Sequence, residues 1–187
     1  MNKAELRKVL KETLSKQPIS ERERKSKLVI NELIGLKEYS KAKTILIYVS
    51  MKEEVSTIEF ITNAIVEGKC VVVPAVDKSG KSMTLHKINS LGDLEPGYKG
   101  IHEPRDKSCE VPSESIDLAV VPGLAFDSRG NRLGRGKGMF DKLFEKAKCP
   151  KIALAFDFQV VETVPVEGHD FPVEIIVTEK RVLRLIR

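Results

Sequence analysis

The segment Thr44–Val76, TILIYVSMKEEVSTIEFITNAIVEGKCVVVPAV, decides the fold class. Its two ends, Thr44–Val49 and Cys70–Val76, are short apolar runs rich in β-branched residues, as is typical of strands buried on both faces of a parallel sheet. Between them, Ser56–Glu59 has the pattern of a capping box, which predicts a helix from there to Gly68. The segment therefore predicts a strand, a helix and a second strand.

Two further helices are expected ahead of this segment. Residues 3–16 carry leucine and valine at helical spacing, and Pro18 follows as a stop. A second capping box, Ser20–Glu23, predicts the start of the next helix, which is expected to end at Gly35.

The remainder of the chain continues the alternation. Asp77–Lys81 is expected to be a turn, and residues 89–115, rich in Gly, Pro, Ser and charge, a long irregular loop. Further strands are expected at Met83–Ile88 (antiparallel or at an edge), Ile116–Val121, Lys151–Phe156, Glu174–Thr178 and Val182–Ile186 (an edge), with a helix at Gly138–Lys148. The sequence predicts a single α/β domain over residues 1–187, with three layers around a mainly parallel, Rossmann-like sheet that has an antiparallel edge.

Charge is distributed unevenly along the chain. The net charge of +5 lies within residues 1–27, which hold nine basic and four acidic residues. A nucleic-acid-binding arm and the solvated face of a helix pair both fit this excess, and the interleaved acids and missing aromatics favour the helix faces.

The composition of the chain indicates in which compartment the protein is expected. The three cysteines are far apart and form no zinc-type spacing, which favours a reduced, cytoplasmic location. No run approaches the ~18–20 apolar residues of a membrane span. We therefore expect no membrane partner and no nucleic-acid partner, and a monomer.

The most informative stretch is residues 120–144, VVPGLAFDSRGNRLGRGKGMFDKLF. It places Arg129, Arg132, Arg135 and Lys137 among four glycines, between the end of a strand and the start of a helix. Ligands bind at the carboxyl ends of strands in open α/β sheets, glycine lets the backbone approach a phosphate, and a helix N-terminus attracts anions. The stretch predicts a polyphosphate cradle, although it matches neither a Walker A loop nor a dinucleotide fingerprint.

Asp141 lies in the first turn of the helix expected there. The helix dipole alone explains an acid at this place, but the carboxylate could also hold Mg²⁺ against bound phosphates.

Residues Val121–Asp141 closely resemble the signature of the 5-formyltetrahydrofolate cyclo-ligases (methenyltetrahydrofolate synthetases), PGLAFD…G.RLG.GKGYYD. The resemblance extends in the family's order to Lys3, Leu6-Arg7, Tyr48–Met51, Glu54, Thr57, Gly100-Ile101, Glu103-Pro104, Pro165 and Glu167–Asp170. It implies the fold of the NagB/RpiA/CoA-transferase-like proteins. It also implies ATP-dependent closure of 5-formyltetrahydrofolate to 5,10-methenyltetrahydrofolate through an iminium phosphate, with ADP and phosphate as products.

The same resemblance implies the site residues. The ATP site would comprise Lys3, Ala4, Glu5, Leu6, Arg7, Arg132, Leu133, Gly134, Arg135, Gly136, Lys137, Gly138, Met139 and Phe140. The folate site would comprise Val49, Glu54, Arg135, Gly136, Lys137, Gly138 and Met139. Mg²⁺ would be held by Asp141 and Asp170, and Arg135 and Lys137 would be the catalytic residues.

Residue types alone support plainer interpretations at several of these positions. Glu54 would be an ordinary solvated acid, and Lys3 and Arg7 would lie on an exposed helix face. His169 and Asp170 would be an ordinary loop pair.

The chain departs from the family pattern in two ways. Met139-Phe140 stands where the family commonly has Tyr-Tyr, so a role that needs a phenolic hydroxyl is in doubt there. The chain has no Trp, so stacking on the pterin would come from Phe, Tyr, Met or Arg. Another phosphate-handling enzyme of the same fold remains the alternative to the cyclo-ligase.

Overall fold

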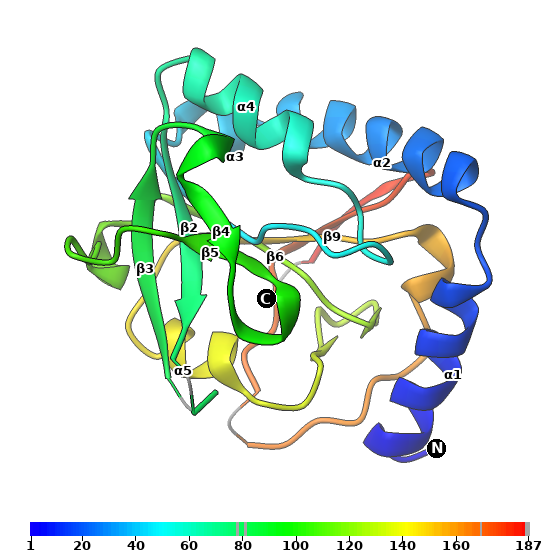
Figure 1. The fold of residues 1–187 in the computed structure, drawn as a ribbon. Coiled ribbons are helices and arrows are strands. Elements are labelled where there is room, and N and C mark those ends of the chain that lie inside the picture. Colours follow the sequence, from blue (N-terminus) through cyan, green and yellow to red (C-terminus); the bar gives the residue numbers. More distant parts are fainter. Residues whose placement is uncertain (78, 81, 169, 186–187) are drawn as a thin grey trace.

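A computed structural model of the chain describes residues 1–77, 79–80, 82–168 and 170–185 (Figure 1). Predictions for Lys81, His169 and Ile186 lie outside the described residues. Within the described part, seven strands form one sheet in the order β11-β10-β9-β6-β1-β2-β3. Their bounds are β1 Thr44–Ile47, β2 Cys70–Val76, β3 Met83–Ile88, β6 Leu118–Val121, β9 Lys151–Leu154, β10 Ile175–Val177 and β11 Val182–Arg184.

The sheet is parallel in its interior and antiparallel at both edges. β10, β9, β6, β1 and β2 pair in parallel, whereas β3 and β11 run antiparallel to their neighbours. The predicted mainly parallel sheet is confirmed, and it has an antiparallel strand at each edge. β1 lies at the centre, with Ile45 paired to Val71 on one side and to Leu118 on the other.

Helices cover both faces of the sheet, as the three-layer prediction required. They are α1 Lys3–Ser15, α2 Ile19–Ile34, α3 Lys37–Lys41, α4 Ile58–Val66 and α5 Met139–Phe144. Figure 1 shows α2 and α4 together on one face and α5 beneath the other.

The side chains of β1 show why its sequence is apolar from Ile45 to Ile47. Ile45 and Ile47 pack in a cluster with Leu33 of α2 and Phe60 of α4. Leu46 points to the other face and packs in a cluster with Phe144 of α5. Because successive residues face opposite layers and both layers are covered, each of these three positions must be apolar.

Both predicted capping boxes are wrong. α2 begins directly after Pro18 without a side-chain cap. At the start of α4, the hydroxyl of Thr57 instead donates to the carbonyl of Tyr48 at 2.8 Å and accepts from the amide of Ser50 at 3.1 Å. Thr57, and not the expected Ser56, lies at the N-cap of α4, and its hydroxyl ties the helix to the residue that follows β1. A capping box is present on α1, where Asn2 and Glu5 each accept from the other's amide.

Residues 89–115 are more ordered than predicted. They contain the hairpin of β4 (Leu94–Pro96) and β5 (His102–Pro104), and the short 3₁₀ turns η1 (Leu91–Asp93), η2 (Tyr98–Gly100) and η3 (Ser113–Ser115). A second small hairpin, β7 (Ala125–Phe126) with β8 (Arg132–Leu133), lies inside the glycine-rich stretch.

We expect Leu33→Ala to lower the free energy of unfolding by about 2–5 kcal/mol, because its side chain is fully buried between α2 and the sheet. Leu28→Ala on the same helix is the control, since Leu28 is 40% exposed, and it should cost less than about 1 kcal/mol. Urea denaturation measures both values. Equal losses would contradict the packing described for α2.

Candidate functional site

The sheet contains one place where the direction of chain progression reverses. From β1 the chain moves to β2 on one side, whereas β6 lies on the other side and leads on to β9 and β10. Neighbouring parallel strands whose connections leave in opposite directions open a crevice at their carboxyl ends, which is the usual ligand site of open α/β sheets. The segments that border this crevice are 48–55 after β1 and 122–124 after β6.

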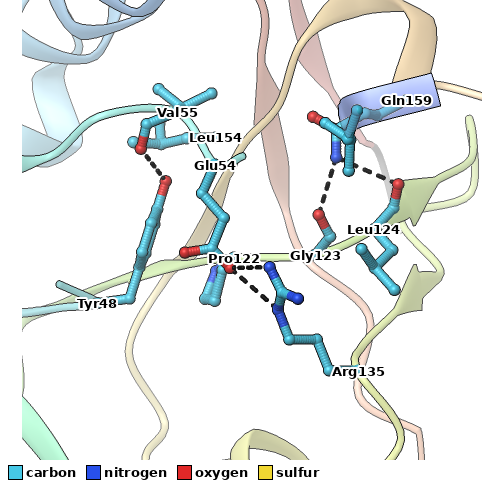
Figure 2. Close-up of a pocket in the computed structure, with 10 residues that line it drawn as sticks. Tyr48, Glu54, Val55, Pro122, Gly123, Leu124, Arg135, Leu154 and Gln159 are labelled. Carbon is cyan, nitrogen blue, oxygen red and sulfur yellow. Dashed lines mark hydrogen bonds and ion pairs between the residues drawn. The ribbon is translucent and has the colours of Figure 1, made fainter. Parts of the chain in front are cut away.

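A small cavity of about 10 Å³ lies at this point, room for roughly one water molecule (Figure 2). It is lined by Leu14, Tyr48, Glu54, Val55, Pro122, Gly123, Leu124, Arg135, Leu154 and Gln159. The lining combines both crevice segments with one residue of the glycine-rich loop. The loop therefore meets the sheet at its switch point.

An ion pair between Glu54 and Arg135 makes this connection. Oε1 of Glu54 accepts from Nε of Arg135 at 3.2 Å and from Nη2 at 3.0 Å. Its other oxygen accepts from the amide of Met51 at 2.9 Å. The side chain of Glu54 is only 11% exposed, so the interpretation as a solvated acid is wrong.

Two residues beside Glu54 are fully enclosed. The hydroxyl of Tyr48 donates to the carbonyl of Val55 at 2.9 Å. Burial, and next the charge of Glu54, raise the pKa of Tyr48 well above its ordinary value, so this phenol stays neutral. Val49, implied as a folate residue, is buried in the core cluster on the α2 face.

Gln159 is a site residue that sequence reasoning missed. Its Nε2 donates to the carbonyls of Gly123 and Leu124 at 2.9 and 3.1 Å, and its Oε1 accepts from the amide of Phe156 at 2.8 Å. The side chain thereby fixes the segment that follows β6. Nothing in the local sequence distinguishes it from a surface glutamine.

The glycine-rich loop is held by α1. Nε of Arg7 donates to the carbonyl of Gly134 at 3.0 Å. Gly136 has φ +107° and Gly138 φ +61°, in the region that favours glycine, and a Cβ on Gly136 would lie 3.5 Å from the guanidinium carbon of Arg7. Two stretches that the resemblance assigned to ATP, 3–7 and 132–140, are thus in direct contact. Residue types alone had indicated that Arg7 lies on a free helix face. The structure shows that its side chain contacts the loop instead.

Each of the two carboxylates expected to hold Mg²⁺ is paired with a cation. Arg132 donates to Oδ1 of Asp141 at 2.9 Å, and the amide of Phe171 donates to the same oxygen at 3.2 Å. The ammonium of Lys3 lies 2.7 Å from Oδ2 of Asp170 and 3.3 Å from Glu167. Among the described residues, no three His, Cys, Asp or Glu side chains gather closely enough to hold a metal ion together.

Arg132 is the most enclosed cation of the loop. Its side chain is 5% exposed, and its guanidinium lies 5.7 Å from the ring centroid of Phe140. Its Nε is buried and has no hydrogen-bond partner within the described residues. A buried donor of this kind is costly unless something binds it.

The other implied residues take varied positions. Ala4 and Glu5 are exposed on α1, and Leu6 is buried beneath them. Leu133 is buried in the core, whereas Met139 is partly exposed at the first position of α5. Lys137 reaches away from the loop and donates to the carbonyl of Gly80 at 3.2 Å.

The helix after the loop is shorter than predicted. It spans Met139–Phe144, whereas Gly138–Lys148 was expected, and Gly138 caps it in the left-handed conformation. A helix of this length has little dipole, so the cations of the loop, more than the helix, attract an anion here.

The chain matches a family model described as the 5-formyltetrahydrofolate cyclo-ligase family over residues 1–179. It is 32% identical to the 5-formyltetrahydrofolate cyclo-ligase of Mus musculus, across 93% of this chain and 92% of that protein. Its fold is similar to the solved structure of Aquifex aeolicus 5,10-methenyltetrahydrofolate synthetase, with a TM-score of 0.89, 37% identity and coverage of 100% and 94% of the two chains.

A second solved structure, a 5,10-methenyltetrahydrofolate synthetase from Mycoplasma pneumoniae, has a TM-score of 0.78 at 21% identity, with coverage of 96% and 99% of the two chains. This likeness supports the fold. No helix in the described part of the chain is long and apolar enough to cross a bilayer.

Arg132→Met should lower the free energy of unfolding by about 3–5 kcal/mol, because it leaves the buried charge of Asp141 without its partner. The double variant Arg132→Met/Asp141→Leu removes both charges and should recover most of that loss. Urea denaturation of the wild type and both variants gives the comparison. A double variant as unstable as the single one would contradict a charge penalty as the cause.

Proposed function

Because the chain belongs to the 5-formyltetrahydrofolate cyclo-ligase family, we propose that it closes 5-formyltetrahydrofolate to 5,10-methenyltetrahydrofolate with hydrolysis of ATP to ADP and phosphate. The observation that carries the proposal is the contact of Glu54 with Arg135 at the switch point of the sheet. This contact joins the segment after β1, proposed to receive the folate, to the glycine-rich loop, proposed to receive the triphosphate.

The chemistry requires activation of a poor leaving group. The formyl oxygen attacks the γ-phosphorus of ATP, the bond from that phosphorus to ADP breaks, and an iminium phosphate forms on N5. N10 of the folate then attacks the formyl carbon, the carbon–oxygen bond to phosphate breaks, and N10 loses its proton. Neither step needs a covalent bond to the protein, so positioning and charge neutralisation account for catalysis.

The loop supplies cations for both purposes. Glu54 binds Nε and Nη2 of Arg135, and no described residue accepts from Nη1, so that edge of the guanidinium can meet a phosphate oxygen. Lys137 adds a further positive charge on the same loop, and Arg7 adds one from α1, where its side chain contacts the loop. We propose that Arg135 and Lys137 neutralise the transferring phosphoryl group, and that Arg7 and Lys3 bind the remainder of the triphosphate.

Mg²⁺ would neutralise further charge on the triphosphate. The hydrogen bonds to Asp141 within the described residues all reach Oδ1, which leaves Oδ2 as a metal ligand. One or two carboxylates suit Mg²⁺, which usually keeps several waters and binds substrate phosphates. We propose Asp141, with Asp170 beside it, as the carboxylates that hold the ion.

The purified protein should convert 5-formyltetrahydrofolate to methenyltetrahydrofolate, followed by ultraviolet absorbance, and only when ATP is present. Arg135→Ala should lower kcat/KM by roughly a hundredfold, because it removes a cation that faces developing charge. Arg24→Ala is the control, since Arg24 is an exposed arginine of α2 that pairs with Glu21, and it should stay within about twofold of wild type. Absence of product at every working temperature would refute the proposed function.

Asp141→Asn should weaken turnover by raising the Mg²⁺ concentration required, while the protein stays folded. The amide keeps the size of the carboxylate and its acceptor for Phe171 but loses the charge that a cation needs. Glu145→Gln, an exposed change just after α5, serves as the control. An unchanged Mg²⁺ dependence in Asp141→Asn would remove this residue from the metal site.

A further inference from the structure

Lys137 is held by two segments outside the glycine-rich loop. Its ammonium donates to the carbonyl of Gly80, in the turn between β2 and β3, and to the hydroxyl of Tyr98, in η2. It also lies 4.4 Å from the centroid of the Tyr98 ring. An ammonium has three N–H donors, and two of them are used here, so the third can meet an anion.

Gly80, Tyr98 and Lys137 are closely packed where they meet. Gly80 has φ +67°, and a Cβ at that position would overlap both the ammonium of Lys137 and the hydroxyl of Tyr98. Three segments far apart in the sequence therefore converge within the space that a methyl group would occupy.

A buried carboxylate anchors Tyr98. Glu103 of β5 is 2% exposed, and its Oε1 accepts from the amide of Val76 at 3.1 Å and from the amide of Tyr98 at 3.2 Å. Its other oxygen accepts from Lys107 at 2.9 Å. Because Val76 is the last residue of β2, Glu103 fixes the turn that carries Tyr98 to the carboxyl end of the sheet.

We propose that Tyr98 is a positioning residue for Lys137, and that Glu103 holds Tyr98 in place, so that residues 97–103 form a further wall of the nucleotide site. This inference rests on the proposed function, because it assumes that Lys137 binds the triphosphate. It also assigns a role to Glu103, a residue that matches the family pattern but to which the sequence alone assigned no function.

The physical gain is preorganisation. A lysine side chain has four rotatable bonds and loses much freedom when it binds a phosphate. Tyr98 restricts that freedom before the nucleotide arrives, through a hydrogen bond to the ammonium and the electrostatic attraction of the ring. The cost of ordering Lys137 is then already met in the folded protein, so affinity for the nucleotide rises.

The test measures ATP and ADP affinity by calorimetry, together with the KM values for ATP and for 5-formyltetrahydrofolate. Tyr98→Phe keeps the ring and removes the hydroxyl, and it should weaken ATP binding roughly threefold to tenfold. Tyr98→Ala removes both contacts and should weaken binding further. The KM for the folate should stay within about twofold of wild type in Tyr98→Phe.

The chain offers a matched control in Tyr39. Its ring also lies 4.4 Å from a lysine ammonium, that of Lys69, and its hydroxyl donates to Glu67, yet it lies on α3, away from the loop. Tyr39→Phe should leave ATP affinity unchanged. A loss of affinity in both tyrosine variants would show a general effect of destabilisation and overturn the proposal.

A second comparison separates positioning from simple structural damage. In a Lys137→Ala background, Tyr98→Phe should cause no further loss of ATP affinity, because its target is already gone. Wild-type affinity in Tyr98→Phe, or equal losses with and without Lys137, would overturn the role of Tyr98 while leaving the proposed function intact. If the wild type neither binds ATP nor forms product, the proposed function itself fails.

Discussion

The parallel pairing of β1 with β6 is the constraint on which the site depends. The two strands are joined through Ile45–Leu118, Leu46–Ala119 and Ile47–Val120, and both are buried on each face. Parallel neighbours cannot be joined by a tight turn, so the chain between them must cross over through α4, β2 and the segments up to β6. What remains at the carboxyl ends is a crevice between two segments that no local interaction would bring together. The contact of Glu54 with Arg135 is possible only because of this pairing.

The positive charge of the N-terminus takes on a different meaning in the structure. Arg7 contacts the glycine-rich loop and Lys3 the segment at Asp170. Other cations of residues 1–27 form exposed ion pairs, such as Lys16 with Glu12 and Arg24 with Glu21. Ion pairs of this kind contribute little to stability. A stripe of cations facing one polymer would leave them unpaired on a common face. The arrangement instead directs part of the charge toward the proposed anion site and neutralises part of the remainder locally.

The strands of the sheet could be predicted from the sequence, whereas the structure of the segments that connect them could not. Continuous apolar runs such as 45–47 and 118–121 can be recognised in the sequence because burial on both faces leaves no polar position. The capping boxes failed because the helices begin at other residues: α2 begins at Ile19, ahead of Ser20, and the N-cap of α4 is Thr57, one residue after Ser56. The hairpin of β4 and β5 was missed because three-residue strands show no periodicity.

Residue types alone indicated the cations and glycines of the loop, whereas the buried polar residues that hold the loops in place were given no role. Glu103 and Gln159 are polar side chains with 2% and 3% exposure, which is rare for these types and invisible in a sequence. Asp127 belongs with them: it is buried and accepts from the amides of Arg129, Asn131 and Val164.

All three of these anchors bind backbone amides or carbonyls of the loops around the crevice. A buried polar group is expensive unless fully bonded, so each one specifies a single loop conformation. Catalysis by charge placement requires that the donors already lie where the charge will develop. In the proposed function, the exposed cations of the loop act on a phosphoryl group, and buried side chains that take no part in catalysis fix the backbone that carries them.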